Sequence, residues 1–151
     1  MERSEKAVFT NMCMIYDENG RVLVQDRLNP NWPGITFPGG HVDKAESFSN
    51  SVIREVHEET GLTISSPVLC GVKQFQTVEG ERYVVLLYKT NKFHGELASS
   101  QEGQVYWVHR EELHTYNLAD DFEKMLEVFE SDDISELFYS AEEEDLHASL
   151  L

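Results

Sequence analysis

Residues 40–62 read GHVDKAESFSNSVIREVHEETGL, and this stretch decides the fold. Its apolar residues Phe48, Val52 and Val56 recur every four positions, which is the spacing of one face of an α-helix. A glycine at position 61 is typical of a helix C-terminus, because glycine readily adopts the left-handed conformation that ends a helix. The pattern therefore predicts a helix between residues 46 and 61.

The end of this predicted helix carries three glutamates, Glu55, Glu58 and Glu59, at positions i, i+3 and i+4. Like charges at these spacings destabilise a helix, and the helix C-terminus is itself the negative end of the helix dipole. Glu59 also projects onto the apolar face, where an unpaired charge is costly. Arg54 alone cannot neutralise three acids, so we expect a bound cation. Oxygen donors without cysteine favour Mg²⁺ or Mn²⁺ over zinc, and the bend at residues 38–40 can add backbone carbonyls.

The rest of the chain predicts a sheet-rich α/β domain. Residues 8–25 contain two apolar, β-branched runs around an Asn-Gly turn, which indicates a β-hairpin. Further strands are expected at residues 68–75, 82–90 and 104–108. A second helix is expected over residues 118–129, where Asn, Asp and apolar residues follow one another as at a helix start.

The chain has 151 residues, of which 40% are hydrophobic, as in a single folded domain. We place that domain at residues 1–130, followed by an acidic C-terminal segment at residues 131–151. Residues 111–151 hold 14 of the 28 acidic residues and a single lysine. A solvated helical face and a frayed end are expected there, although several apolar residues still offer a face that can pack.

Charge excludes several classes of partner. Lysine and arginine number 12 against 28 acidic residues, a net charge of −16 that repels duplex nucleic acid and anionic membranes. We find no apolar run near the roughly 20 residues that span a bilayer, and the mixed-charge start does not resemble a signal peptide. The two cysteines are too few for a disulfide framework and fit a reducing compartment. A cytoplasmic protein with a small-molecule partner is expected.

The residues of this stretch also resemble a known family. The pattern G-x5-E-x7-R-E-U-x-E-E-x-G-U, where U is aliphatic, is the Nudix box, and every fixed position is matched. The matching residues are Gly40, Glu46, Arg54, Glu55, Val56, Glu58, Glu59, Gly61 and Leu62. The resemblance implies a Nudix α/β/α sandwich around a mixed β-sheet, and an enzyme that hydrolyses a nucleoside diphosphate linked to another moiety.

The resemblance also implies roles for the residues of the box. Glu55, Glu58 and Glu59 would be catalytic metal ligands for Mg²⁺ or Mn²⁺, with the Gly40 carbonyl as a further ligand. Arg54 would hold these carboxylates in place. Two further residues of the box, Glu46 and Gly61, would be structural.

Outside the box, two residues stand where family members carry functional ones. Glu102 precedes a predicted strand, where many members have a loop glutamate that acts as general base or extra metal ligand; the alternative is an acid in a turn. Arg27 ends the second predicted strand, where members place an arginine that contacts phosphate or sugar; the alternative is a solvated arginine.

The segment after residue 106 resembles the C-terminal half of MutT-type enzymes, which sanitise oxidised purine nucleotides. Asn117, Asp120 and Asp121 match positions that read the edge of the base in those enzymes. The alternative is that Asn117 caps the second helix and the two aspartates suit its first turn.

These features lead to one main functional hypothesis. The chain is expected to hydrolyse a nucleoside triphosphate such as 8-oxo-dGTP to the monophosphate and pyrophosphate, as a monomer or homodimer. Residues 74–78 lack the proline of ADP-ribose hydrolases and the tyrosine of dinucleoside-polyphosphate hydrolases. The alternatives are a Nudix hydrolase of another derivative, such as ADP-ribose or a nucleotide sugar, and a noncatalytic Nudix module that binds a ligand.

Overall fold

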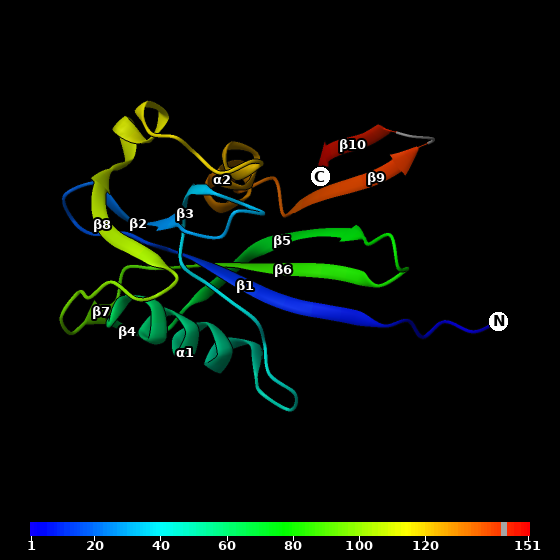
Figure 1. The fold of residues 1–151 in the computed structure, drawn as a ribbon, viewed down its shortest axis with the longest axis horizontal. Coiled ribbons are helices and arrows are strands. Elements are labelled where there is room, and N and C mark those ends of the chain that lie inside the picture. The colour runs from blue at the N-terminus through cyan, green and yellow to red at the C-terminus, as the bar shows by residue number, and fades with distance from the viewer. Residues whose placement is uncertain (143–144) are drawn as a thin grey trace.

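The computed structural model describes residues 1–142 and 145–151 and has two helices packed on opposite faces of a central sheet (Figure 1). The elements in chain order are β1 (Ala7–Ile15), β2 (Arg21–Arg27), β3 (Gly34–Thr36), α1 (Phe48–Thr60), β4 (Thr63–Ile64), β5 (Val68–Gln76), β6 (Arg82–Thr90), β7 (Phe93–His94), β8 (Gly103–His109), the 3-10 helix η1 (Arg110–Thr115), α2 (Phe122–Glu130), β9 (Glu136–Glu142) and β10 (Asp145–Leu150).

The largest sheet has the strand order β1-β6-β5-β9-β10 and is mixed. β1 is parallel to β6 and β5 is parallel to β9, whereas the β5–β6 and β9–β10 pairs are antiparallel. A second sheet has the order β3-β2-β8, and β4 pairs with β7. The mixed sheet between two helices confirms the expected α/β/α sandwich.

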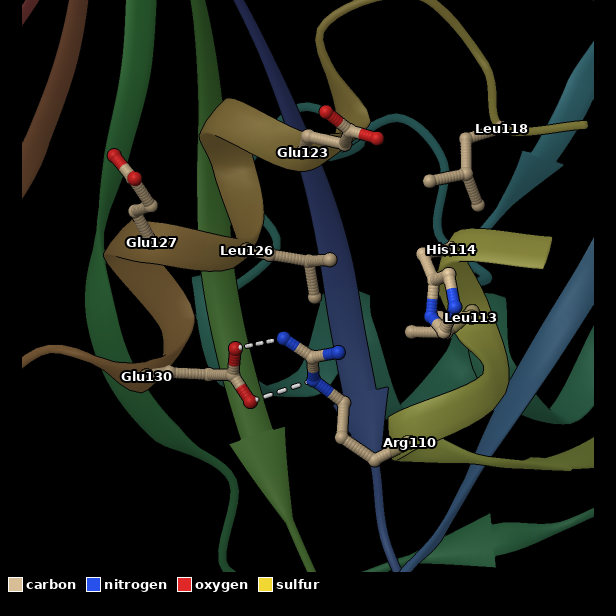
Figure 2. Close-up of a pocket in the computed structure, with 8 residues that line it drawn as sticks. All are labelled: Arg110, Leu113, His114, Leu118, Glu123, Leu126, Glu127 and Glu130. Atoms are coloured by element: carbon tan, nitrogen blue, oxygen red, sulfur yellow. Dashed lines mark hydrogen bonds and ion pairs between the residues drawn. The ribbon is translucent and has the colours of Figure 1, made fainter. Parts of the chain in front are cut away.

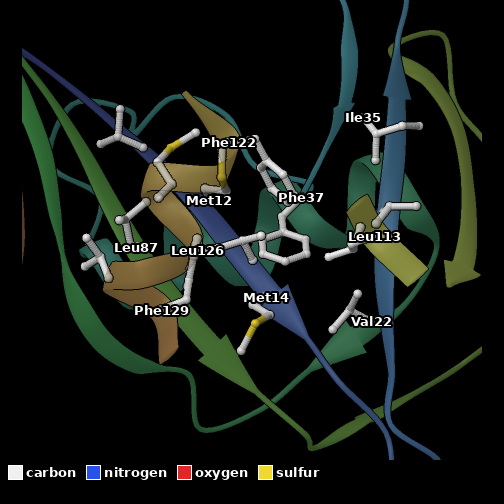
Figure 3. Close-up of a cluster of buried hydrophobic side chains, with 14 of the residues drawn as sticks. Met12, Met14, Val22, Ile35, Phe37, Leu87, Leu113, Phe122, Leu126 and Phe129 are labelled. Atoms are coloured by element: carbon white, nitrogen blue, oxygen red, sulfur yellow. The ribbon is translucent and has the colours of Figure 1, made fainter. Parts of the chain in front are cut away.

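Alternating residues of the central strands divide the core into two parts. Met12 and Met14 of β1 pack toward α2, in a cluster that includes Phe122 and Phe129 (Figure 3). Cys13, the residue between those two methionines, packs on the other side in the cluster that contains α1. Because both faces of β1 are covered, apolar residues occupy consecutive positions in its sequence and do not alternate with polar ones.

Helix α1 confirms the helix predicted from the apolar spacing. The Ser47 side chain caps its start by accepting a hydrogen bond from the Asn50 amide at 3.0 Å. Gly61 ends it with a φ of 79°, and its amide donates to the His57 carbonyl at 2.9 Å. Two local signals thus fix the length of the helix that carries the glutamates.

Two predictions for the second half of the chain need correction. Helix α2 begins at Phe122 and not near residue 118, because the preceding segment is extended along β3, where the Ala119 amide donates to the Ile35 carbonyl at 2.9 Å. The frayed C-terminal end is also wrong for the described residues, since β9 pairs with β5 and β10 pairs with β9. In the ranges that the structure describes, no helix is long and apolar enough to cross a membrane.

Candidate active site

A cleft of about 1080 Å³ runs across one face of the large sheet. Its floor consists of side chains from four neighbouring strands, which point to the same face because they alternate along each strand. These floor residues are Thr10 and Met12 of β1, Tyr83 and Val85 of β6, Lys73 and Phe75 of β5, and Tyr139 of β9. Three strand spacings separate β1 from β9, a distance of about 14 Å. The cleft is therefore elongated, with chemically different ends.

The end of the cleft beside β1 carries the carboxylates. Glu55, Glu58 and Glu59 reach it from α1, and Gly39 and Gly40 line it from the loop before that helix. The loop is fastened to β1, because the Asn11 amide donates to the Gly40 carbonyl at 2.7 Å and the Asn11 side chain accepts from the Gly40 amide at 3.0 Å. The Asn11 amide thus already uses one lone pair of the Gly40 carbonyl oxygen, and one lone pair is left for a ligand.

Glu59 is the most buried of the three glutamates, with 6% of its surface exposed. Its carboxylate accepts a hydrogen bond from the Gly39 amide at 3.0 Å. Burial raises the pKa of Glu59 to about 7, and the nearby charge of Glu55 acts in the same direction. Burial also raises the pKa of Glu55 itself. The apo protein therefore holds a carboxylate that is stabilised when a cation approaches.

The two loop glycines are required by close packing. A Cβ atom on Gly39 would lie 2.0 Å from the Asn11 carbonyl oxygen, and one on Gly40 would lie 2.3 Å from the Glu55 carboxylate carbon. No larger residue fits at these positions without movement of the chain or of Glu55. Glycine thus lets the loop backbone lie directly against the carboxylates.

Arg54 organises the exposed side of the carboxylate cluster. Its guanidinium binds Glu46 through two hydrogen bonds of 2.8 and 2.9 Å, and this pairing lowers the pKa of Glu46 to about 2. The same group contacts Glu55 at 3.0 Å and Glu58 at 3.2 Å. It also donates to the His41 carbonyl at 2.9 Å. Arg54 therefore ties the helix to the loop and orients two glutamates of the cleft.

The donor set suits a hard divalent cation, but it is not arranged as a closed metal centre. In residues 1–142 and 145–151, no three Asp, Glu, His or Cys side chains are grouped as a metal site. Arg54 draws Glu55 and Glu58 toward itself, and the Glu58 side chain is 56% exposed and has room to turn. Mg²⁺ and Mn²⁺ prefer oxygen ligands, and the carboxylates of the three glutamates supply only oxygen. These residues fit such an ion.

Glu102 and Arg27 both line the cleft, as do the glutamates of α1. Both act on Glu59, since the charge of Glu102 raises the pKa of that carboxyl and the charge of Arg27 lowers it. Arg27 also lies over the Trp32 ring at 4.9 Å and donates to the Trp32 carbonyl at 3.2 Å. The structure thus brings these two residues to the carboxylates of the box.

The three residues expected to read a base separate in the structure. Asp121 lines the cleft, whereas Asn117 and Asp120 are absent from its lining among the described residues. Asn117 is exposed, and its carbonyl accepts a hydrogen bond from the Ile35 amide at 2.8 Å. Asn117 does not cap α2 either, because Asp121 occupies the N-cap position. Asp121 alone is placed to meet a ligand in the cleft.

The lining of the cleft also includes residues that the sequence-based prediction did not name, among them Trp32, Lys73 and Tyr139. Lys73 lies within 6 Å of the centres of three rings, at 5.8 Å from Trp32, 5.9 Å from Phe75 and 5.7 Å from Tyr139. Alternation along β5 could have placed Lys73 beside Phe75 on one face. The parallel pairing of β9 with β5 leaves no local signal in the sequence, so Tyr139 could not have been found.

A second, smaller depression of about 270 Å³ lies between η1 and α2 (Figure 2). Arg110 and Glu130 form a two-point ion pair across it, at 2.7 and 2.5 Å, and both side chains are about 40% exposed. The one cation of the arginine and lysine type in this lining, Arg110, is thus already paired, and the elongated cleft, which is larger and holds several charged groups, is the better candidate for a site.

Comparisons with known proteins agree with this description. Residues 8–131 match the NUDIX domain family. An uncharacterized Nudix hydrolase of Bacillus subtilis, YvcI, is 31% identical over 100 residues, which cover 63% of this chain and 61% of that protein. The chain thus aligns with less than two thirds of the length of this relative.

Solved structures give the same result. A MutT protein from Bacillus halodurans superimposes with a TM-score of 0.75 at 26% identity, covering 95% of this chain and 97% of that one. A MutT NUDIX hydrolase from Burkholderia pseudomallei gives a TM-score of 0.69 at 26% identity, covering 82% and 98%. From its fold, its box and the family match over residues 8–131, the chain belongs to the Nudix family.

Proposed function

We propose that this chain is a divalent-metal-dependent pyrophosphohydrolase that converts a nucleoside triphosphate to its monophosphate and pyrophosphate. The observation that carries the proposal is the cleft itself, with carboxylates at the β1 end and a lysine and aromatic rings at the β5 and β9 end, about 10–14 Å away across the strands. That separation suits an extended nucleotide, with its phosphates at the glutamates and its base at the rings. The MutT proteins among the structural neighbours support the same substrate class.

The carboxylate end would bind the phosphates. Glu55, Glu58 and Glu59 would hold Mg²⁺ or Mn²⁺, which when bound offsets the phosphate charge and lowers the pKa of water. Arg54 holds Glu55 and Glu58 beside the cleft, and these two side chains would turn from it toward the ion when the ion binds. Arg27, at the end of β2, lines the same cleft and can contact a phosphate or sugar oxygen.

Glu102 is the remaining acid at this end and would accept a proton or complete the ligand set. It lines the cleft from the segment just before β8. A protein with a net charge of −16 repels a free polyphosphate, so the nucleotide would arrive already paired with the divalent ion. The acidic surface thus favours a metal-complexed substrate over a bare one.

The far end would bind the base. Asp121 can accept hydrogen bonds from ring and exocyclic N–H groups, and Lys73 can donate one to a carbonyl oxygen. A guanine edge offers both kinds of group side by side. We therefore favour a purine substrate of the guanine type, such as 8-oxo-dGTP.

The test is product release from 8-oxo-dGTP, dGTP, dCTP, ADP-ribose and a nucleotide sugar, with Mg²⁺ or with EDTA. We expect Mg²⁺-dependent release of pyrophosphate and the highest kcat/KM for 8-oxo-dGTP. Glu59→Gln should abolish most of this turnover, whereas Glu123→Gln, an exposed glutamate of α2, should leave it unchanged. Cleavage of ADP-ribose or the nucleotide sugar alone would contradict the proposed substrate but not the role of the glutamates. No turnover of any compound would favour the ligand-binding module.

A further inference from the structure

Asp121 has an unusual conformation at the far end of the cleft. Its φ is 72°, in the left-handed region that favours glycine, although its Cβ makes this region unfavourable. It occupies the N-cap position of α2, yet among the described residues its side chain makes no capping hydrogen bond to the helix. The strained backbone and the uncapped helix start direct attention to what the Asp121 side chain does in the cleft.

The carboxylate of Asp121 is held at both oxygens. Oδ2 lies 3.3 Å from the Lys73 ammonium, and Oδ1 accepts a hydrogen bond from the Tyr139 hydroxyl. These partners come from β5 and β9, so the contacts join three separate elements. The Lys73 side chain is 11% exposed and the Asp121 side chain 31% exposed, which leaves the carboxylate accessible from the cleft.

Tyr139 acts as a donor in this contact. Burial and the Asp121 carboxylate both raise the pKa of its phenol, so the hydroxyl stays protonated at neutral pH. Its position is fixed by sheet register, because β9 is parallel to β5 and pairs Tyr139 with Phe75. The strand that carries Tyr139 lies beyond residues 8–131, the region that matches the family.

We propose that Tyr139 is a positioning residue that orients Asp121 toward the base, and that the β9–β10 hairpin thereby belongs to the selectivity end of the substrate cleft. This inference rests on the proposed function, since it assigns the far end of the cleft to a nucleobase. Tyr139 is not expected to touch the reacting phosphates, which lie about three strands away.

The chemistry of the far end indicates the class of base. Each carboxylate oxygen has two lone pairs, and the contacts with Tyr139 and Lys73 engage one on each. The second pair on each oxygen can accept the two neighbouring N–H donors of a guanine edge, while Lys73 donates to the adjacent carbonyl. Without the Tyr139 hydroxyl, Asp121 would lose one of its two anchors and could rotate away from this arrangement.

The experiment measures equilibrium binding of two probes, dGMP and deoxyribose 5-phosphate, to the full chain. Tyr139→Phe should weaken dGMP binding about 3- to 10-fold, as expected for the loss of one hydrogen bond, and leave deoxyribose 5-phosphate binding unchanged. Ser140→Ala is the matched control, because it removes a hydroxyl from the adjacent residue of β9, whose side chain points to the other face. For a hydrolysed triphosphate, the same change should raise KM and leave kcat unaltered.

A double-mutant cycle separates positioning from general stability. If Tyr139 acts through Asp121, then Tyr139→Phe should have no further effect on dGMP binding in an Asp121→Ala background. Additive losses, or equal weakening of both probes by Tyr139→Phe, would overturn the inference. So would a wild-type protein that binds dGMP no better than deoxyribose 5-phosphate. Because binding needs no hydrolysis, a failure of the proposed activity alone would leave this result interpretable.

Discussion

Replacement of Glu59 by glutamine should make the metal-free protein more stable while it removes activity. Burial raises the pKa of Glu59 from its ordinary value of 4.5 to about 7, a difference that corresponds to about 3 kcal/mol against the ionised form. A glutamine oxygen can still accept the hydrogen bond from Gly39, but its buried amide group costs about 1 kcal/mol. We therefore expect a net gain of about 2 kcal/mol in the free energy of unfolding above pH 7.

The gain should depend on pH in a defined direction. As pH rises from 4.5 toward 7, the unfolded chain releases the Glu59 proton while the folded protein retains it, so the wild-type free energy of unfolding falls. Above pH 7 Glu59 is ionised in both the folded and the unfolded state, so the free energy of unfolding of the wild type falls no further. Most of the advantage of Glu59→Gln should therefore be present at pH 8 and absent at pH 5.

The assay is urea denaturation in EDTA at pH 5 and pH 8, with Glu123→Gln as a control for the removal of one surface charge. Addition of Mg²⁺ at pH 8 should stabilise the wild type more than Glu59→Gln, because the variant lacks one charged ligand. An advantage that is equal at the two pH values would refute the assignment to a buried charge. A variant less stable than wild type at pH 8 would refute it as well.

Three further changes have defined outcomes. Arg54→Lys cannot reproduce the two-point contact with Glu46, so turnover should fall at least about tenfold while the melting temperature, measured by circular dichroism, changes little. Gly39→Ala puts a Cβ against the Asn11 carbonyl and should lower the free energy of unfolding in urea by about 1–3 kcal/mol; an unchanged value would contradict this packing. Arg110→Ala breaks a half-exposed ion pair, so it should cost at most about 1 kcal/mol and leave kcat/KM unaltered, and a large loss of activity would point to the smaller depression.

The carboxylate helix could be predicted from sequence because its signals are local. Apolar residues four positions apart and a terminating glycine both lie within residues 46–61, and the structure places the helix at Phe48–Thr60. The burial of Glu59 also followed from its place on the apolar face. The same kind of signal failed at residue 118, because hydrogen bonds from a distant strand, β3, hold residues 117–119 extended.

The aromatic end of the cleft could not be predicted, because it depends on contacts between distant segments. β9 joins the sheet in parallel with β5, and this pairing brings Tyr139 beside Phe75 across more than sixty positions of sequence. The acidic residues of the last segment suggested a solvated end, but parallel pairing is not encoded by a turn or a cap. Lys73 and Asp121 likewise meet across 48 positions of sequence.

The position of Trp32 has a practical consequence for binding experiments. Its ring lies in the cleft with Arg27 and Lys73 beside it, and its indole N–H donates to the Asp120 carbonyl at 3.0 Å. The only other tryptophan is Trp107, which packs against Phe93 on the side of α1. A ligand that displaces either cation changes the electric field around the Trp32 indole, and with it the intrinsic fluorescence. Trp107→Phe would therefore leave Trp32 as the one tryptophan, and selective excitation of tryptophan at its red edge would report ligand binding without any label.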